Sequence, residues 1–149
     1  MVALRKMRPT DRAHIESMQR LLFPTPANYL ASLDEGQWWI ATAPSDDGFD
    51  LAGFCAVAPS RQWTDCAYLS RAGVMPAFRG QGLQRRFIRT RLAWARANGY
   101  RFAITETTAN NCPSINNLID CGFKAFDPPR PWAADGACYW TIDLNRKTQ

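Results

Sequence analysis

The fold is decided by the stretch Val74-Met75-Pro76-Ala77-Phe78-Arg79-Gly80-Gln81-Gly82-Leu83-Gln84. An apolar strand ends at the proline, and an arginine-rich helix begins with the Arg-Gly-Gln-Gly turn. Gly80 and Gly82 have no Cβ, so the backbone can approach an anion closely. The first N–H groups of a helix have no intrahelical partner, and the helix dipole adds partial positive charge there. The stretch therefore predicts a pyrophosphate site, although an ordinary strand-to-helix connection would use similar residues.

Outward from this turn, hydrophobic period and turn chemistry predict alternating strands and helices. The expected strands are residues 2–7, 38–43, 49–58, 66–74 and 101–107, a short strand from Phe123, and residues 137–144. The expected helices run from Thr10 or Asp11 to Pro24, and over residues 25–36, 80–98 and 113–121. A strand, helix, strand order favours a right-handed parallel crossover, so residues 101–107 are expected beside residues 66–74. The predicted fold class is α/β with a mixed sheet.

The composition is typical of one globular domain over residues 1–149, since 46% of the residues are hydrophobic and 21% are charged. The longest apolar stretch, residues 51–58, is too short to cross a membrane, and no export signal is recognised. The five cysteines are odd in number and include no Cys-x-x-Cys pair, so they are expected to be reduced. A cytoplasmic protein without a membrane partner is therefore expected.

The formal net charge of +5 suggests an anionic partner, which would be either a phosphorylated cofactor or nucleic acid. The arginines of the helix over residues 80–98 could equally form a solvated face. No motif of a nucleic-acid reader is recognised, so nucleic-acid binding is the weakest hypothesis. His14 is the single histidine, so neither a zinc cluster nor a histidine-dependent triad is expected, and metal catalysis is not predicted.

Two motifs together resemble the GNAT superfamily of acyl-CoA-dependent N-acetyltransferases, over nearly the whole chain. The family signature Arg/Gln-x-x-Gly-x-Gly/Ala is similar to residues 79–84, and the Val-x-Pro strand end before it also agrees. Gln84 departs from the signature, which has a small residue there. The second motif, an asparagine followed by a short helix that ends in Gly-Phe, is similar to Asn111 through Gly122-Phe123. The resemblance implies a mixed, mostly antiparallel sheet, with a central parallel strand pair splayed around the cofactor and helices on both faces.

The resemblance also implies that acetyl-CoA is the cosubstrate, and it assigns residues to it. The implied cofactor-binding residues are Ala72 and Val74 along the pantetheine arm, Arg79, Gly80, Gln81, Gly82, Leu83 and Gln84 at the pyrophosphate, and Asn111 on the other side of the arm. Ser114 is implied to line the channel near the thiol. For Asn111 and Ser114 the alternative is helix capping, a common role of both residue types.

Acetyl transfer to an amine requires a base for the amine and an acid for the departing thiolate. Glu106 is the candidate base, because burial on a covered strand would make its carboxylate more basic; the alternative is a surface glutamate at a strand end. Many family members have a tyrosine acid where this chain has Leu118. Tyr68, Ser114 through water, or solvent are the candidate proton donors, although a buried strand tyrosine is more often a core residue.

The primary hypothesis is an N-acetyltransferase that moves an acetyl group to an amine of a small molecule or peptide by direct attack on the thioester. The alternative is an acyl-CoA-binding regulatory module without turnover, which the missing tyrosine acid motivates. A homodimer is also expected, from exposed aromatic loops and the sheet edge at residues 137–144, by analogy with the fold.

The acceptor pocket is expected at the two early helices and at the loops over residues 59–65 and 127–136. Aromatic side chains in these regions could stack an aromatic or cationic amine, and nearby carboxylates could supply charge. The aromatic candidates are Tyr29, Trp38, Trp39, Trp63 and Trp132, and the acidic candidates are Asp34, Glu35 and Asp65. For Trp38 and Trp39, which lie inside a predicted strand, a place in the core is the stronger alternative.

Overall fold

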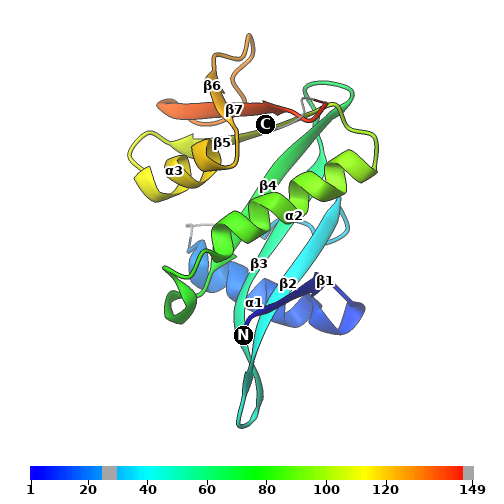
Figure 1. Cartoon of the computed structure of the whole chain (residues 1–149), viewed down its shortest axis with the longest axis vertical. Helices are drawn as coiled ribbons and strands as arrows, with labels where there is room; N and C mark the ends of the chain where they lie inside the picture. The colour runs from blue at the N-terminus through cyan, green and yellow to red at the C-terminus, as the bar shows by residue number, and fades with distance from the viewer. Residues whose placement is uncertain (25–29, 146–149) are drawn as a thin grey trace. The chain divides into compact units, whose positions relative to one another are not determined.

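The computed structural model describes residues 1–24 and 30–145, and these residues form the expected mixture of strands and helices (Figure 1). The strands are β1 Ala3–Lys6, β2 Gln37–Ser45, β3 Gly48–Pro59, β4 Cys66–Val74, β5 Phe102–Thr108, β6 Lys124–Phe126 and β7 Ala137–Asp143. The helices are α1 Arg12–Leu22, α2 Leu83–Ala97 and α3 Cys112–Asp120, with single 3-10 turns at Pro9–Asp11 and Pro76–Phe78. The boundaries of β4 agree with those predicted.

The strands form one mixed sheet in the order β1-β2-β3-β4-β5-β7-β6. Neighbouring strands are antiparallel at β1–β2, β2–β3, β5–β7 and β6–β7, whereas β4 and β5 are parallel. The parallel register pairs residues 66–68 of β4 with residues 102–104 of β5. The predicted fold class, a mostly antiparallel mixed sheet with a central parallel pair, is therefore confirmed.

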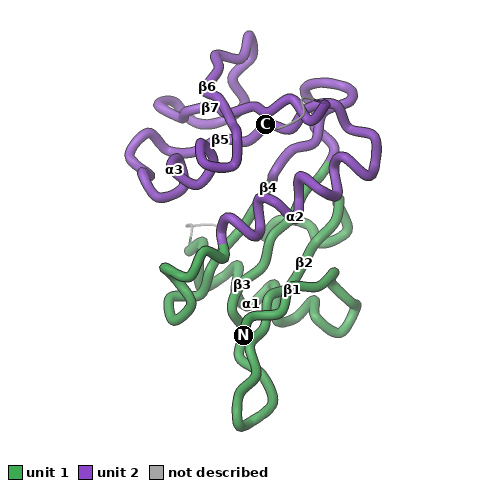
Figure 2. Tube along the Cα trace, viewed as in Figure 1, with its two compact units in different colours: residues 1–58, 70–83 green, residues 59–69, 84–149 purple. Residues whose placement is uncertain are grey.

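The described chain divides into two compact units, which Figure 2 shows in different colours. Unit 1 contains Met1–Ala58 and Ser70–Leu83, and unit 2 contains Pro59–Leu69 and Gln84–Gln149. Strand β4 contributes its first residues to unit 2 and its last residues to unit 1. That the chain works as a single domain stays a prediction.

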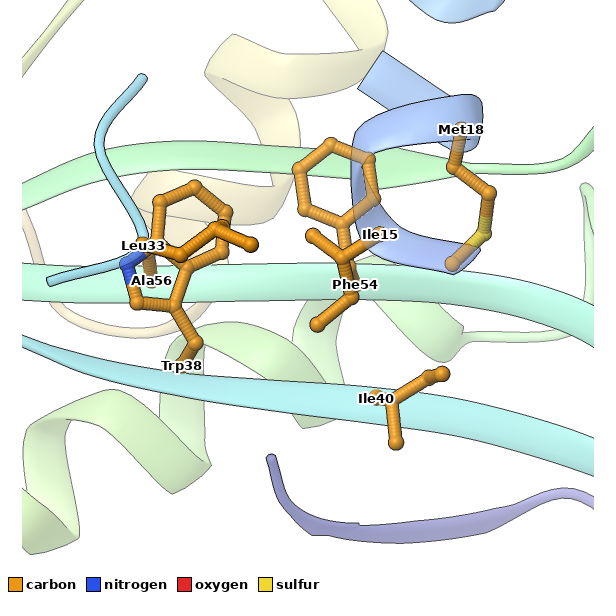
Figure 3. Close-up of a cluster of buried hydrophobic side chains, with 7 residues drawn as sticks. All are labelled: Ile15, Met18, Leu33, Trp38, Ile40, Phe54 and Ala56. Atoms are coloured by element: carbon orange, nitrogen blue, oxygen red, sulfur yellow. The ribbon is translucent and has the colours of Figure 1, made fainter. Parts of the chain in front are cut away.

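The core of unit 1 forms where α1 packs on the β2–β3 hairpin (Figure 3). Ile15 and Met18 recur at helical spacing on one face of α1 and are both fully buried, as the apolar period requires. Trp38 of β2 and Phe54 of β3 stack with their ring centroids 5.9 Å apart. The Nε1–H of Trp38 donates to the backbone oxygen of Glu35 at 3.0 Å, so this buried indole is satisfied within the unit.

The helix expected over residues 25–36 is wrong for its described part, since residues 30–36 contain no helix. Gln19 of α1 explains this, because its side chain accepts from the backbone N–H of Ala31 at 3.0 Å and reaches the Ala31 carbonyl at 3.4 Å. Backbone groups that a helix would use are therefore paired with a side chain. Residues 25–29 of the expected helix, Tyr29 among them, lie outside the described residues.

In unit 2, α2 buries an apolar face and exposes most of its arginines. Phe87, Ile88, Leu92 and Ala95 are buried, as their spacing predicts. Arg91 differs from the expectation of a solvated basic face, because it is only 4% exposed and its Nε donates to the Phe87 carbonyl at 3.1 Å. None of the helices in the described part of the chain is long and apolar enough to span a membrane.

Candidate functional site

The glycine turn over residues 79–84 opens α2 and has the backbone geometry that its sequence predicts. Gly80 and Gly82 have φ of 78° and 77°, a left-handed conformation that favours glycine. These φ values are incompatible with a right-handed helix, so α2 begins at Leu83 and not at Gly80 as expected. A Cβ built on either glycine would meet no protein atom within 4 Å. The turn therefore leaves open space beside its backbone, next to the first amides of the helix.

The side chains around the turn divide into anchors and exposed groups. Leu83 is 3% exposed and fixes the first turn of α2 in the protein interior. Arg79 and Gln81 are exposed, and Gln84 is half-buried. The Nε of Arg79 donates to the Val74 carbonyl at 3.3 Å, which ties the arginine to the end of β4. One of the two strand residues expected along a pantetheine arm, Val74, therefore already shares its carbonyl with the turn.

Tyr68 of β4 and Glu106 of β5 are brought together by the parallel strand pair. Tyr68 pairs in register with Ile104, and Glu106 lies two residues further on the same face of β5. The Tyr68 hydroxyl donates a short hydrogen bond to Oε1 of Glu106. The hydroxyl of Thr105, on the opposite face, donates to the Leu69 carbonyl at 3.0 Å and fixes the same two strands. Two residues that the sequence proposed separately therefore form one hydrogen-bonded pair.

The second carboxylate oxygen of Glu106 has a different environment. Oε2 is buried and has no hydrogen-bond partner among the described residues. Nε1 of Trp132 is also buried, and it too has no hydrogen-bond partner within the described part of the chain. The ring centroid of Trp132 lies 6.5 Å from that of Tyr68, in an edge-to-face arrangement. Unpaired buried polar atoms are rare in proteins because each costs the free energy of its lost hydration.

Five aromatic rings of unit 2 meet around Trp132, and we call them the Trp132 cluster. Its members are Trp63, Tyr68, Phe126, Trp132 and Tyr139. The ring centroid of Trp132 lies 4.5 Å from that of Tyr139, 6.0 Å from Trp63 and 6.3 Å from Phe126. Tyr139 faces both Glu106 of β5 and Phe126 of β6 in the antiparallel register, so these three side chains share one face of the sheet.

Both loops that carry cluster tryptophans are held by hydrogen bonds. The Tyr139 hydroxyl accepts from the backbone N–H of Ala133 at 3.0 Å, next to Trp132. The Ser60 hydroxyl accepts from the backbone N–H of Trp63 at 3.3 Å. Sequence reasoning proposed the two tryptophans but missed Phe126 and Tyr139, whose alternation along short strands was the available signal.

Asn111 has the capping role that the sequence allowed as an alternative, whereas Ser114 supplies the backbone N–H that is capped. Asn111 caps α3, and its Oδ1 accepts from the backbone N–H of Ser114 at 3.4 Å. Ser114 lies in the first turn of α3. Leu118 is 5% exposed, and its carbonyl accepts from the Phe123 N–H at 3.0 Å, so it serves the core of unit 2. A role of Ser114 in proton transfer and of Asn111 in cofactor binding stays a prediction.

Four of the remaining acceptor candidates have burial or contacts that the structure describes. Trp38 and Trp39 are buried, as the core alternative predicted. Asp34 accepts from Arg12 at 3.0 Å within unit 1. The Asp65 carbonyl accepts from the backbone N–H groups of residues 101 and 102. Among the residues that the structure describes, no group of three or more His, Cys, Asp and Glu side chains is placed to hold a metal ion.

A model of the acetyltransferase (GNAT) family matches residues 3–123. This match covers most of the chain, so the chain belongs to the GNAT acetyltransferase family. No curated protein sequence matches the chain.

Solved structures of similar fold include yncA from Salmonella typhimurium with its cofactor acetyl-CoA, at TM-score 0.75 and 16% identity over 100% of this chain and 97% of that one. The ribosomal-protein-S18-alanine N-acetyltransferase from Escherichia coli matches at TM-score 0.74 and 17% identity, over 100% and 97%. The IAA acetyltransferase from Bacillus cereus matches at TM-score 0.75 and 14% identity, over 96% and 99%. At such identities the likeness shows a common fold, and that fold is the one predicted.

Proposed function

We propose that the protein transfers an acetyl group from acetyl-CoA to an amine of a small molecule or peptide, by direct attack of the amine on the thioester. The observation that carries this proposal is the Tyr68–Glu106 pair, in which one carboxylate oxygen is held and the other is buried without a partner among the described residues. Family membership and the acetyl-CoA of a structural neighbour support the choice of cosubstrate.

The residues present fit a coenzyme with a pyrophosphate. Gly80 and Gly82 leave open space that a Cβ would fill, and the N-terminal amides of α2 favour an anion there. The exposed guanidinium of Arg79 adds charge, and Gln81, Leu83 and Gln84 complete the turn through backbone or amide groups.

The strand end before the turn offers backbone groups to the amides of a pantetheine arm. Ala72 and Val74 lie beyond Tyr68, the last residue of β4 in the parallel register. Their backbone groups can pair with the arm as an added strand would. The amide of Asn111 is the proposed contact from α3. When bound, acetyl-CoA supplies the activated acetyl group.

Glu106 is the proposed base. An amine of pKa near ~10.4 is mostly protonated at neutral pH, so it must lose a proton to solvent before it can attack and a second proton during the reaction. Oε2 of Glu106 can take the second proton, since no protein group among the described residues uses this oxygen. Tyr68 orients the carboxylate through Oε1. Because the hydrogen bond already holds the carboxylate in one orientation, little conformational entropy is lost when Glu106 acts as the base.

The base takes one proton from the amine, and the leaving thiolate must gain one proton. As the N–C bond forms and the C–S bond breaks, the Tyr68 hydroxyl can give its proton to sulfur while Oε2 of Glu106 holds the proton from the amine. Oε2 then loses its proton to solvent, and the Tyr68 oxygen takes one from solvent. In net terms, one proton has left the amine and one has reached the thiol, and the enzyme returns to its starting state. Ser114 through water is the second candidate donor, since Leu118 stands where the family resemblance implies a tyrosine acid.

The test of the base is Glu106→Gln, with acetyl-CoA, an amine panel and detection of released thiol. General-base loss is expected to lower kcat by roughly 10²- to 10⁴-fold. Calorimetry should show unchanged acetyl-CoA affinity, and Asp50→Asn, at an exposed carboxylate of β3, should keep full activity. Binding of acetyl-CoA without thiol release from any amine would favour the regulatory module instead.

The test of the turn is Gly82→Trp, which is expected to abolish acetyl-CoA binding by filling the open space beside the backbone. Gly99→Trp is the matched control, because Gly99 also has positive φ, of 82°, and open space around its Cβ position. Gly99 lies after α2 and away from the turn along the chain, so the Gly99→Trp variant should bind acetyl-CoA as tightly as wild type. Equal loss in both variants would show that backbone strain, and not a blocked site, is responsible.

The cytoplasm remains the predicted compartment, supported by five free cysteines. A homodimer also stays a prediction, which light scattering of the purified protein can test.

A further inference from the structure

The Trp132 cluster is unusual among the aromatic groups of this protein because it combines flat apolar surface with unpaired polar atoms. Its rings belong to three strands and two loops of unit 2, and Trp63 is 39% exposed at its edge. Oε2 of Glu106 and Nε1 of Trp132 are the unpaired atoms. A core needs neither feature, since buried polar atoms in a core are normally paired.

The two unpaired atoms define what a ligand must supply. Oε2 of Glu106 is an acceptor and requires a donor, which an ammonium or amine provides with charge complementarity. Nε1–H of Trp132 is a donor and requires an acceptor, such as a hydroxyl or carbonyl oxygen. The surrounding rings favour an aromatic body, which would pack edge to face or offset against them. They also favour a cation, since aromatic faces attract positive charge.

The number of unpaired atoms limits the size of the ligand. One donor and one acceptor match a molecule with a single amine and a single polar group. A peptide would present a backbone donor and acceptor at every residue, whereas the buried unpaired side-chain atoms of the described residues are one acceptor and one donor. A polyamine would need several carboxylates, whereas Glu106 is the carboxylate bonded to a ring of the cluster.

The cluster is also preorganised for such a ligand. Tyr139 holds the Trp132 loop through Ala133, and Ser60 holds the Trp63 loop through two backbone N–H groups. The backbones of the two loops are held, but both unpaired atoms are covered, so a ligand that reaches them must move a ring side chain; Trp63 is the exposed ring of the cluster. Fixed loops lower the entropy cost of binding.

We infer that the Trp132 cluster and Glu106 bind the acetyl acceptor, and that this acceptor is a small primary alkylamine that bears an aromatic ring with one hydrogen-bond acceptor. This inference rests on the proposed function, because it assigns the substrate class of the same site. In the resulting step the amine nitrogen forms the new bond to the acetyl carbon, its proton goes to Glu106, and the coenzyme thiol leaves with one proton.

The experiment compares three amines that differ by one group at a time: ethylamine, 2-phenylethylamine and tyramine. Wild-type KM should fall about 10-fold or more from ethylamine to phenylethylamine, since the ring gains buried apolar surface. It should fall a further 3- to 10-fold or so for tyramine, whose hydroxyl oxygen can accept from Trp132. Equal KM for all three amines would overturn the inference.

Variants assign these preferences to the cluster. Trp132→Ala should remove most of the gain from the ring, and Trp132→Phe should keep the ring gain but remove the tyramine gain. A purely structural role would raise KM for all three amines alike, which would also overturn the inference. Phe49→Ala is the control, since Phe49 is an exposed aromatic of unit 1 and its loss should change none of the values.

Direct binding separates this inference from the proposed function. Calorimetry with phenylethylamine should show binding to wild type in the presence of CoA and at least 10-fold weaker binding to Trp132→Ala. If the amine binds in this way without turnover, the Trp132 cluster is a binding site for this class of amine, but the enzymatic proposal fails and the amine is not an acetyl acceptor. If ethylamine or a phenylalanine-starting peptide is acetylated at least 10-fold better than phenylethylamine, the enzymatic proposal stands and the inference of a small arylalkylamine fails.

Discussion

Trp38 in unit 1 and Trp132 in unit 2 both contact aromatic neighbours, but their indole N–H groups differ. Trp38 is 2% exposed and donates to the Glu35 carbonyl at 3.0 Å. Trp132 is half-buried, and its Nε1 has no hydrogen-bond partner among the described residues. The indole N–H of Trp38 thus has its hydrogen-bond acceptor within its own unit, whereas that of Trp132 has none among the described residues.

Two carboxylates repeat this difference. Asp11 in unit 1 accepts from the Arg5 guanidinium at 2.6 and 2.9 Å and from the Arg8 backbone N–H at 2.7 Å, so both its oxygens are paired. Glu106 in unit 2 has one oxygen bonded to Tyr68 and one that is buried without a partner among the described residues. Paired polar groups stabilise a fold, whereas unpaired ones are expected where a ligand completes the structure.

The largest expected effect comes from truncating one aromatic residue in each unit. Phe54→Ala should lower the free energy of unfolding by about 3–5 kcal/mol, because Phe54 is fully buried and a cavity remains. Trp132→Ala should cost clearly less, since Trp132 is only half-buried. Urea unfolding measures both variants. Equal losses would mean that the Trp132 cluster is a second core and would break the comparison.

A smaller effect tests the two indole N–H groups themselves. Trp38→Phe should cost about 1–3 kcal/mol, from the lost hydrogen bond and a small cavity. Trp132→Phe removes an N–H without a protein partner, so its stability should stay within about 0.5 kcal/mol of wild type. Thermal unfolding at a single pH is sufficient to compare the stability of both variants with that of wild type. A destabilised Trp132→Phe would show that this N–H is satisfied in the free protein.

The smallest expected effect concerns the two carboxylates and pH. The Arg5 hydrogen bonds hold the pKa of Asp11 below its ordinary value, against the opposing effect of burial, and the Arg8 backbone N–H adds to the lowering. Asp11 therefore stabilises the fold above its unfolded pKa of about 3.9, and this stability is lost as the pH falls further. Asp11→Asn should cost about 1 kcal/mol at pH 7, since Arg5 is partly exposed.

The control for this prediction is Glu106→Gln, which leaves unit 1 unchanged. Its stability at pH 7 should equal or exceed that of wild type, because the charge on a buried oxygen is removed while the amide oxygen can still accept from Tyr68. The free energy of unfolding, measured at several pH values between 7 and 3, should change less with pH for Asp11→Asn than for wild type. An unchanged acid slope in Asp11→Asn would assign the acid sensitivity to other groups.

The sequence by itself determined the features that depend on neighbouring residues. The bounds of β4 follow from its apolar run, and the glycine turn follows from two residues that adopt positive φ without strain. Asn111 likewise caps α3 through a bond to a residue three positions away. Such features need no knowledge of the rest of the chain.

Only the tertiary structure decided which distant residues act together. Tyr68 meets Glu106 because the β4–β5 register aligns them, and the short strand β6 brings Phe126 to Tyr139 through its pairing with β7. The helix expected over residues 25–36 was wrong where it is described, because Gln19, far away in the chain, binds the Ala31 backbone. Strand register and long-range hydrogen bonds arise from packing of the whole chain, and local propensity carries no information about them.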